Sequence, residues 1–224
     1  MRLRSMLPVV FDLDGTLIDS LPNVTEAANG LLEDDGLPPL SPDVVVHFVG
    51  RGERVLLDRL ITVTDLKVGD YDALMGRFIE HYKRAAAKTR LFPGVAEALT
   101  ELRHAGFALA LCTNKPRAPL IPTLAAAGLT ETFDLVIAGD DLDKRKPDPE
   151  PLRYIMSELG VERCLYVGDS EVDAETAGRA GVPFLFFTEG IRTVPIAEIP
   201  HDAAFANFSE LPELVRRFTR SPAH

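Results

Sequence analysis

The stretch Leu-Pro-Val-Val-Phe-Asp-Leu-Asp-Gly-Thr, residues 7–16, carries a short apolar run directly into two aspartates, a glycine and a threonine. An apolar run of this length, without polar alternation, is typical of a strand covered on both faces of a parallel sheet. Comparable runs recur at residues 107–112, 135–138, 164–167 and 184–187. The intervening stretches are amphipathic, at residues 95–105, 119–127, 149–159 and 172–180. This alternation predicts an α/β fold with a doubly wound parallel sheet.

Residues 20–88 interrupt the alternation. Their apolar side chains follow a helical period, at Leu56, Leu57, Leu60, Ile61, Leu74, Phe78, Ile79 and Tyr82. They contain no convincing buried strand, because the β-branched run at 44–46 follows a Ser-Pro pair that favours a helix start. We expect an all-helical cap domain at residues 20–88, inserted into a core domain made of residues 1–19 and 89–224.

The composition excludes several classes of partner. The chain has 24 basic and 34 acidic residues and a net charge of −10, so its surface repels nucleic acids and acidic membranes. No apolar stretch reaches the length of a membrane span, and residues 1–6 lead into no signal-type cleavage region. Two cysteines in apolar runs make no disulfide framework. We expect a cytoplasmic protein without nucleic-acid or membrane partners; the sequence leaves monomer and homodimer open.

Polar clusters follow the predicted strands. Asp12 to Thr16 follow the first apolar run, Thr113-Asn114-Lys115 the second and Gly168-Asp169-Ser170 the fourth, while Lys146-Pro147 comes a few residues after the third. In a doubly wound sheet, ligands bind beyond the carboxyl ends of the strands. The four clusters are therefore expected to meet at one edge of the sheet and to form one site.

The residue types at this edge suit phosphoryl transfer. Asp12 can attack phosphorus, and Asp14 can protonate the leaving alkoxide and then activate the water that ends the reaction. Asp12 and Asp169 offer the carboxylates that Mg²⁺ prefers. The Thr113 hydroxyl, nearby backbone N–H groups and Lys146 can stabilise the charge that develops in the transition state.

Some of these positions have structural alternatives. Taken alone, Thr113-Asn114 is typical of a turn, and Lys146-Pro147 is typical of an exposed lysine beside a proline. Ser170 and Asp173 have the spacing of a helix N-terminal capping pair, so Asp173 is either a functional residue or a helix cap.

Taken together, these residues resemble the haloacid dehalogenase superfamily over essentially the whole chain. The resemblance rests on Asp12-Leu13-Asp14-Gly15-Thr16, Thr113-Asn114, Lys146-Pro147, and Gly168-Asp169 with Asp173. It implies a Rossmann-like core with a helical cap after the first motif, and a Mg²⁺ cofactor. True dehalogenases of this superfamily lack an acid at the position of Asp14, so the resemblance implies a phosphatase.

The resemblance also implies residue roles. Asp12 would be the nucleophile and Asp14 the general acid/base. Thr113, Asn114 and Lys146 would bind the phosphate or the substrate. Metal binding would fall to Asp12, Asp169 and Asp173, directly or through water, and to the backbone carbonyl of Asp14.

Smaller cues resemble the phosphoglycolate phosphatases within that superfamily. They are the stretches at residues 11–20, 113–116 and 146–152, and Val49-Gly50-Arg51-Gly52 in the cap. A guanidinium can pair with a carboxylate through two hydrogen bonds, so Arg51 is a hypothetical partner for the carboxylate of 2-phosphoglycolate. A solvated surface arginine is the alternative interpretation.

We therefore expect a Mg²⁺-dependent phosphatase of a small phosphate monoester, in the first place 2-phosphoglycolate, acting through an aspartyl-phosphate at Asp12. The alternatives are hydrolysis of sugar phosphates, nucleotides or pyrophosphate, a phosphomutase on the same scaffold, and a metal-binding regulatory module. Asp14 opposes the last alternative, because a site that only holds metal needs no general acid.

Overall fold

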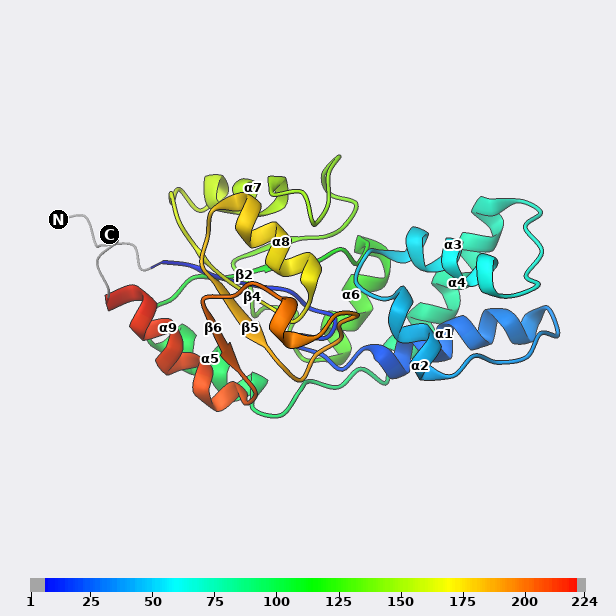
Figure 1. The fold of residues 1–224 in the computed structure, drawn as a ribbon, viewed down its shortest axis with the longest axis horizontal. Helices are drawn as coiled ribbons and strands as arrows, with labels where there is room; N and C mark the ends of the chain where they lie inside the picture. Colours follow the sequence, from blue (N-terminus) through cyan, green and yellow to red (C-terminus); the bar gives the residue numbers. More distant parts are fainter. Residues whose placement is uncertain (1–6, 221–224) are drawn as a thin grey trace.

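Six parallel strands form one sheet in the order β3-β2-β1-β4-β5-β6 (Figure 1). The computed structural model describes residues 7–220. The strands are β1 (Val9–Phe11), β2 (Leu109–Cys112), β3 (Leu135–Ile137), β4 (Leu165–Gly168), β5 (Phe184–Phe187) and β6 (Ala203–Phe205). The strand order runs outward from β1 in both directions, which is the doubly wound arrangement. The predicted fold class is confirmed.

Five helices cover the two faces of the sheet (Figure 1). They are α5 (Val95–His104), α6 (Arg117–Ala126), α7 (Glu150–Glu158), α8 (Glu171–Ala180) and α9 (Leu211–Arg220). Within β1, Val9 and Phe11 point to the face covered by α5 and α9, whereas Val10 points to the face covered by α7 and α8. Successive side chains of a strand point to opposite faces, so an apolar run buries both of them.

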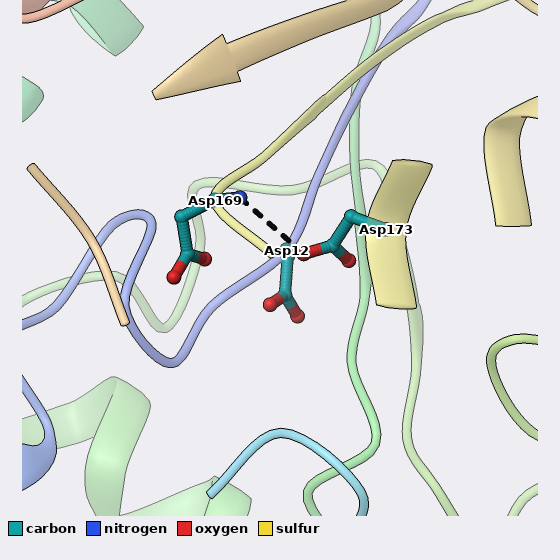
Figure 2. A group of neighbouring side chains, drawn as sticks. All are labelled: Asp12, Asp169 and Asp173. Atoms are coloured by element: carbon teal, nitrogen blue, oxygen red, sulfur yellow. Dashed lines mark hydrogen bonds between the residues drawn. The ribbon is translucent and has the colours of Figure 1, made fainter. Parts of the chain in front are cut away.

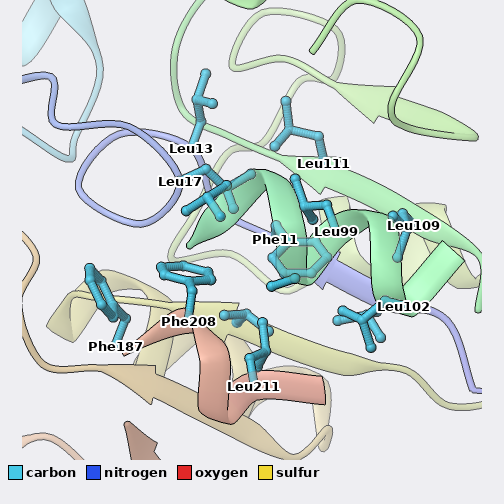
Figure 3. Packing of buried hydrophobic residues seen from close by; sticks show 14 of the residues in the cluster. Phe11, Leu13, Leu17, Leu99, Leu102, Leu109, Leu111, Phe187, Phe208 and Leu211 are labelled. Carbon is cyan, nitrogen blue, oxygen red and sulfur yellow. The ribbon is translucent and has the colours of Figure 1, made fainter. Parts of the chain in front are cut away.

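Aromatic rings close the core beneath α5 and α9 (Figure 3). The ring centroid of Phe187 lies 5.4 Å from that of Phe205 and 4.9 Å from that of Phe208. Phe208 is fully buried and belongs to a short 3-10 helix, η3 (Phe208–Glu210), directly before α9. The C-terminal part of the chain is therefore an integral part of the core.

The sequence analysis missed β6 and α9. Strand β6 is only three residues long, pairs on one side with β5, and contains two alanines, of which Ala204 is exposed. Alanine is not a strong strand former, so the segment lacks the pattern of a buried strand. Several predicted runs were also too long: residues 7–11 and 107–112 become the shorter β1 and β2.

The segment between β1 and α5 is helical and lies beyond one end of the sheet (Figure 1). Its α-helices, called the cap helices here, are α1 (Leu21–Asp34), α2 (Pro42–Val45), α3 (Glu53–Val63) and α4 (Tyr71–Ala86), with a 3-10 turn, η1 (Val46–Phe48), after α2. They share an apolar core in which Leu31, Leu57 and Phe78 are fully buried. Helix α4 also packs against α6, one of the helices that cover the sheet.

The two connections to the cap helices lie side by side. Ile18 and Leu91 form an isolated antiparallel bridge. The Asp19 backbone N–H donates to the Arg90 carbonyl at 3.0 Å, and the Phe92 N–H donates to the Leu17 carbonyl at 3.0 Å. The chain therefore leaves the sheet and returns to it at one place.

No helix among residues 7–220 is long and apolar enough to cross a membrane. Residues 1–6, where the sequence analysis expects no signal-type region, lie outside the described part of the chain.

Replacing Phe208 by alanine should lower the free energy of unfolding by about 3–5 kcal/mol, because it removes a fully buried ring from the core. Urea unfolding followed by circular dichroism measures the change. The control is Ile121→Ala on α6, whose side chain is 61% exposed and should change stability by less than about 0.5 kcal/mol. Equal stability of the two variants would show that η3 contributes little to the core.

Candidate active site

The carboxyl ends of the central strands bring the predicted site residues together. Asp12 follows β1, Thr113 follows β2, and Asp169 follows β4. A cavity of about 30 Å³ lies between this edge and the cap helices. Its lining includes five of the predicted site residues: Asp12, Asp14, Thr113, Asn114 and Lys146.

Lys146 is the centre of the site. Its Nζ lies 2.7 Å from Asp12 Oδ1 and 2.7 Å from Asp173 Oδ1, and it donates to the Tyr166 hydroxyl at 2.9 Å. All four side chains are buried. An ammonium has three N–H donors, so each of them has one oxygen to bind.

Asp173 is a helix-capping residue that also contacts Lys146. It forms a capping box with Ser170 at the start of α8, and its Oδ1 accepts from Lys146 and from the Tyr166 hydroxyl at 2.7 Å. Its Oδ2 accepts from the Ser170 hydroxyl at 2.6 Å and from the backbone N–H groups of Ser170 and Asp169. A Cβ on Gly168 would lie 2.6 Å from the Cβ of Asp173, so this approach needs a glycine.

Asp12, Asp169 and Asp173 converge, as Figure 2 shows. One oxygen from each lies within 4.8 Å of the others. The Thr16 hydroxyl donates to Asp169 Oδ1, and the Ile191 backbone N–H donates to Asp169 Oδ2 at 2.6 Å. These donors fix the direction in which the Asp169 carboxylate points.

Gly15 permits Asp169 to come this close. Its φ is +88°, a conformation that side chains rarely adopt, and a Cβ there would lie 2.2 Å from Asp169 Oδ2. A glycine is therefore needed at position 15 for two reasons, the backbone conformation of the turn and the close approach of the Asp169 carboxylate.

Burial and mutual repulsion shape the charges in this group. Burial raises the pKa of Asp12 to about 7, while Lys146 opposes the rise and the charge of Asp173 adds to it. Burial, together with Asp173 and Asp12, raises the pKa of Asp169 well above its usual range. Burial also disfavours ionised Asp173, but the charge of Lys146 and the hydrogen bonds outweigh it, and the pKa of Asp173 is lowered. Burial thus shifts Asp12 and Asp169 towards their neutral forms, and a further cation nearby would oppose this shift.

Asn114 and Lys115 connect this edge to the cap helices. The Asn114 side-chain N–H donates to the Lys146 carbonyl at 2.9 Å and to the Gly50 carbonyl at 3.0 Å. The Lys115 ammonium lies 2.9 Å from Asp14 Oδ1, donates to the Tyr82 hydroxyl of α4, and lies 4.0 Å from the centre of the Tyr82 ring. Core and cap therefore meet across the cavity through polar contacts.

Arg51 is the predicted site residue that lies apart from the others. It is exposed, and although Gly50 and Gly52 on either side line the cavity, Arg51 does not belong to the lining. Its proposed contact with a substrate carboxylate stays a prediction.

Several residues of the site received no role in the sequence analysis: Thr16, Glu53, Tyr82, Lys115 and Tyr166. Two of them carried a usable signal. Tyr166 has a polar hydroxyl group although it lies in an otherwise apolar strand, and Lys115 directly follows Thr113-Asn114. Glu53 and Tyr82 reach the cavity only through the packing of the cap helices.

A family model for haloacid dehalogenase-like hydrolases matches residues 9–187. The chain belongs to this family. The hydrolase is 44% identical over 212 residues to a phosphoglycolate phosphatase of Cereibacter sphaeroides, covering 93% of this chain and 97% of the relative. It is 42% identical over 215 residues to a phosphoglycolate phosphatase of Rhodobacter capsulatus, covering 95% and 98%.

A crystal structure of a predicted phosphoglycolate phosphatase from Haemophilus somnus superposes on the hydrolase with a TM-score of 0.85. The two share 30% identity, and the match covers 95% of this chain and 99% of the other. The family and these relatives confirm the predicted enzyme class, a phosphoric monoester hydrolase.

Glu53 is the first residue of α3, and its buried carboxyl group lies in the lining of the cavity. It is 5% exposed, and its Oε2 has no hydrogen-bond partner among the described residues. Burial raises the pKa of Glu53 to about 8, with Lys115 opposing the rise and Asp14 adding to it. The neutral form is therefore favoured in the folded hydrolase at pH 7.

This shift predicts a pH-dependent stability. The unfolded chain has a Glu53 pKa near 4.5, so between pH 4.5 and pH 8 the folded state binds more protons, and the free energy of unfolding falls as pH rises. Glu53→Gln should remove a fall on the order of a few kcal/mol over this window. Urea unfolding in EDTA at pH 5, 6.5 and 8 measures it, with exposed Glu33→Gln as the control that follows the wild-type curve. Parallel curves for wild type and Glu53→Gln would contradict a neutral buried Glu53.

Proposed function

We propose that this hydrolase is a Mg²⁺-dependent phosphatase that cleaves 2-phosphoglycolate through an aspartyl-phosphate at Asp12. The observation that carries the proposal is the position of Asp12. It lies at a cavity wall, 2.7 Å from a buried lysine and beside two further buried aspartates. The named activity of the relatives supports the choice of substrate.

The charges of the site fit a divalent cation. With all three carboxyl groups ionised, which a bound cation would favour, the buried group of three aspartates and Lys146 would carry a net charge of −2. Hard divalent cations prefer oxygen ligands of this kind. All five donors on Asp173 compete with a cation for its oxygens, whereas Asp12 and Asp169 keep acceptor capacity. Asp12 and Asp169 would therefore hold Mg²⁺ directly, and Asp173 would act mainly by orienting Lys146.

When bound, Mg²⁺ would offset the repulsion between Asp12 and the substrate phosphate and favour the ionised form of Asp12. The Asp12 carboxylate then attacks phosphorus, and the bond from phosphorus to the ester oxygen breaks. Asp14 gives its proton to the leaving alkoxide. Lys146 and the Thr113 hydroxyl are placed to stabilise the phosphoryl oxygens during this step.

The second half of the reaction restores the enzyme. Asp14, now ionised, takes a proton from a water molecule that attacks phosphorus, and the bond between Asp12 and phosphorus breaks. Inorganic phosphate leaves, and Asp14 is again protonated. The cap helices border the cavity and would limit the access of bulk water to the substrate before Asp12 attacks.

Asp12→Asn should abolish turnover while the protein still folds, because an amide cannot serve as the nucleophile. The assay is phosphate release with Mg²⁺ from 2-phosphoglycolate, hexose phosphates, nucleotides and pyrophosphate. The matched control is Asp65→Asn on the exposed surface, which should keep wild-type rates. Normal turnover by Asp12→Asn would falsify the aspartyl-phosphate mechanism, and a preference for another phosphate would discard the proposed substrate alone.

Metal binding can be tested without turnover. Millimolar Mg²⁺ should raise the melting temperature of the wild type, since a ligand that binds only the folded state stabilises it. Asp169→Asn should lose most of this shift, because one carboxylate of the site is gone. Thermal unfolding at increasing Mg²⁺ gives the comparison, again with Asp65→Asn as control. If Asp169→Asn and the control show the same shift, the cation binds elsewhere.

A further inference from the structure

The lining of the cavity contains two positively charged side chains, Lys115 and Lys146. Lys146 is occupied by Asp12 and Asp173 and lies where the phosphoryl group is transferred. Lys115 has a different surrounding. Its side chain is 1% exposed, and its ammonium lies between Asp14 of the core and Tyr82 of α4.

In the proposed reaction, the part of the substrate that is not transferred lies near Lys115. A phosphate ester with its phosphorus at Asp12 has its leaving oxygen next to Asp14. The remainder of the substrate therefore extends towards the side chains around Asp14. On the cap side of the cavity these are largely apolar, such as Val24, Phe48 and Leu56.

We propose that Lys115 is a specificity-determining residue that binds the anionic end of the substrate that is not transferred. This inference rests on the proposed function, and for 2-phosphoglycolate the anionic end is the carboxylate. A buried ammonium and a carboxylate form a charge-assisted hydrogen bond, which is stronger than one between neutral groups.

Binding of the carboxylate also changes the surroundings of Asp14. In the structure, Lys115 Nζ lies 2.9 Å and 3.2 Å from the two oxygens of Asp14. A substrate carboxylate competes for the same ammonium, so it draws Lys115 away from Asp14. A phosphate ester without a carboxylate leaves Lys115 on Asp14.

Glu53 does not oppose a carboxylate at this place. Its carboxyl group is buried in the same lining, and Oε2 has no partner among residues 7–220. Because its neutral form is favoured at pH 7, it can donate a hydrogen bond to a carboxylate. The exposed Arg51 lacks such a position in the lining.

The test compares two substrates that differ only at one end: 2-phosphoglycolate and ethyl phosphate, in which a methyl group replaces the carboxylate. The kcat/KM ratio of the two is measured with Mg²⁺ for the wild type and for Lys115→Met. We expect the ratio to fall by about 10- to 100-fold in Lys115→Met, which matches the usual contribution of a hydrogen bond to a charged group. Lys115→Arg keeps the charge and should retain a large part of the preference.

Lys144→Met serves as the matched control, because Lys144 is 60% exposed and pairs with surface carboxylates. It should keep the wild-type ratio. Both substrates are measured on one sample, so the ratio does not depend on the folded fraction of a variant.

Each other outcome overturns the inference. A preference that survives in Lys115→Met but is lost in Arg51→Met would assign the carboxylate to Arg51 and leave the proposed function intact. A preference that survives in both variants would place the contact elsewhere, again with the proposed function intact. A wild type without preference for 2-phosphoglycolate would overturn both the proposed substrate and the role of Lys115.

Discussion

The buried contact of Lys146 with Asp12 and Asp173 is the interaction on which the rest of the site depends. It joins the end of β1, the loop after β3 and the first turn of α8 through one ammonium. Burying a carboxylate is costly unless it is paired and hydrogen-bonded, and here one lysine serves two of them. Asp169, the third carboxyl group of the cluster, has no such partner in the part of the chain that the structure describes, and the proposed cation would fill that place.

The architecture of the sheet explains why these groups meet. Parallel strands end at the same edge, so the residues after β1, β2 and β4 are neighbours although they lie far apart in the chain. Helix α8 begins at the same edge, and Asp173 of its capping box is also the partner of Lys146. A single carboxylate thus orders both the start of the helix and the side chain of Lys146, so local folding and site geometry cannot vary independently.

The sequence was sufficient for the first five strands and for the position of the polar residues at their carboxyl ends. Asp12 and Asp169 follow short buried strands, and the rule for doubly wound sheets then places them together. The sequence left Asp173 open between a functional residue and a helix cap, because both fit the same spacing; the structure shows the cap and a contact with Lys146. Strand β6 was missed because a three-residue edge strand with two alanines has no distinctive pattern. Glu53 and Tyr82 could not be assigned to the cavity from the sequence. The helical period tells which face of a helix is buried, but not which residues of the core that face contacts.

The paired connections at Ile18 and Leu91 have an evolutionary consequence. The helical insertion starts and ends at one place, where its two connections are hydrogen-bonded to each other. An insertion of another length or shape would only need its two ends to lie side by side at this place. Asp12, Asp14 and both lysines of the cavity lie on the core side of these connections, whereas the apolar wall and Tyr82 lie on the cap side. The two walls of the cavity are therefore encoded in separable lengths of chain, so selection can change the apolar wall while the carboxylates and lysines of the core stay as they are.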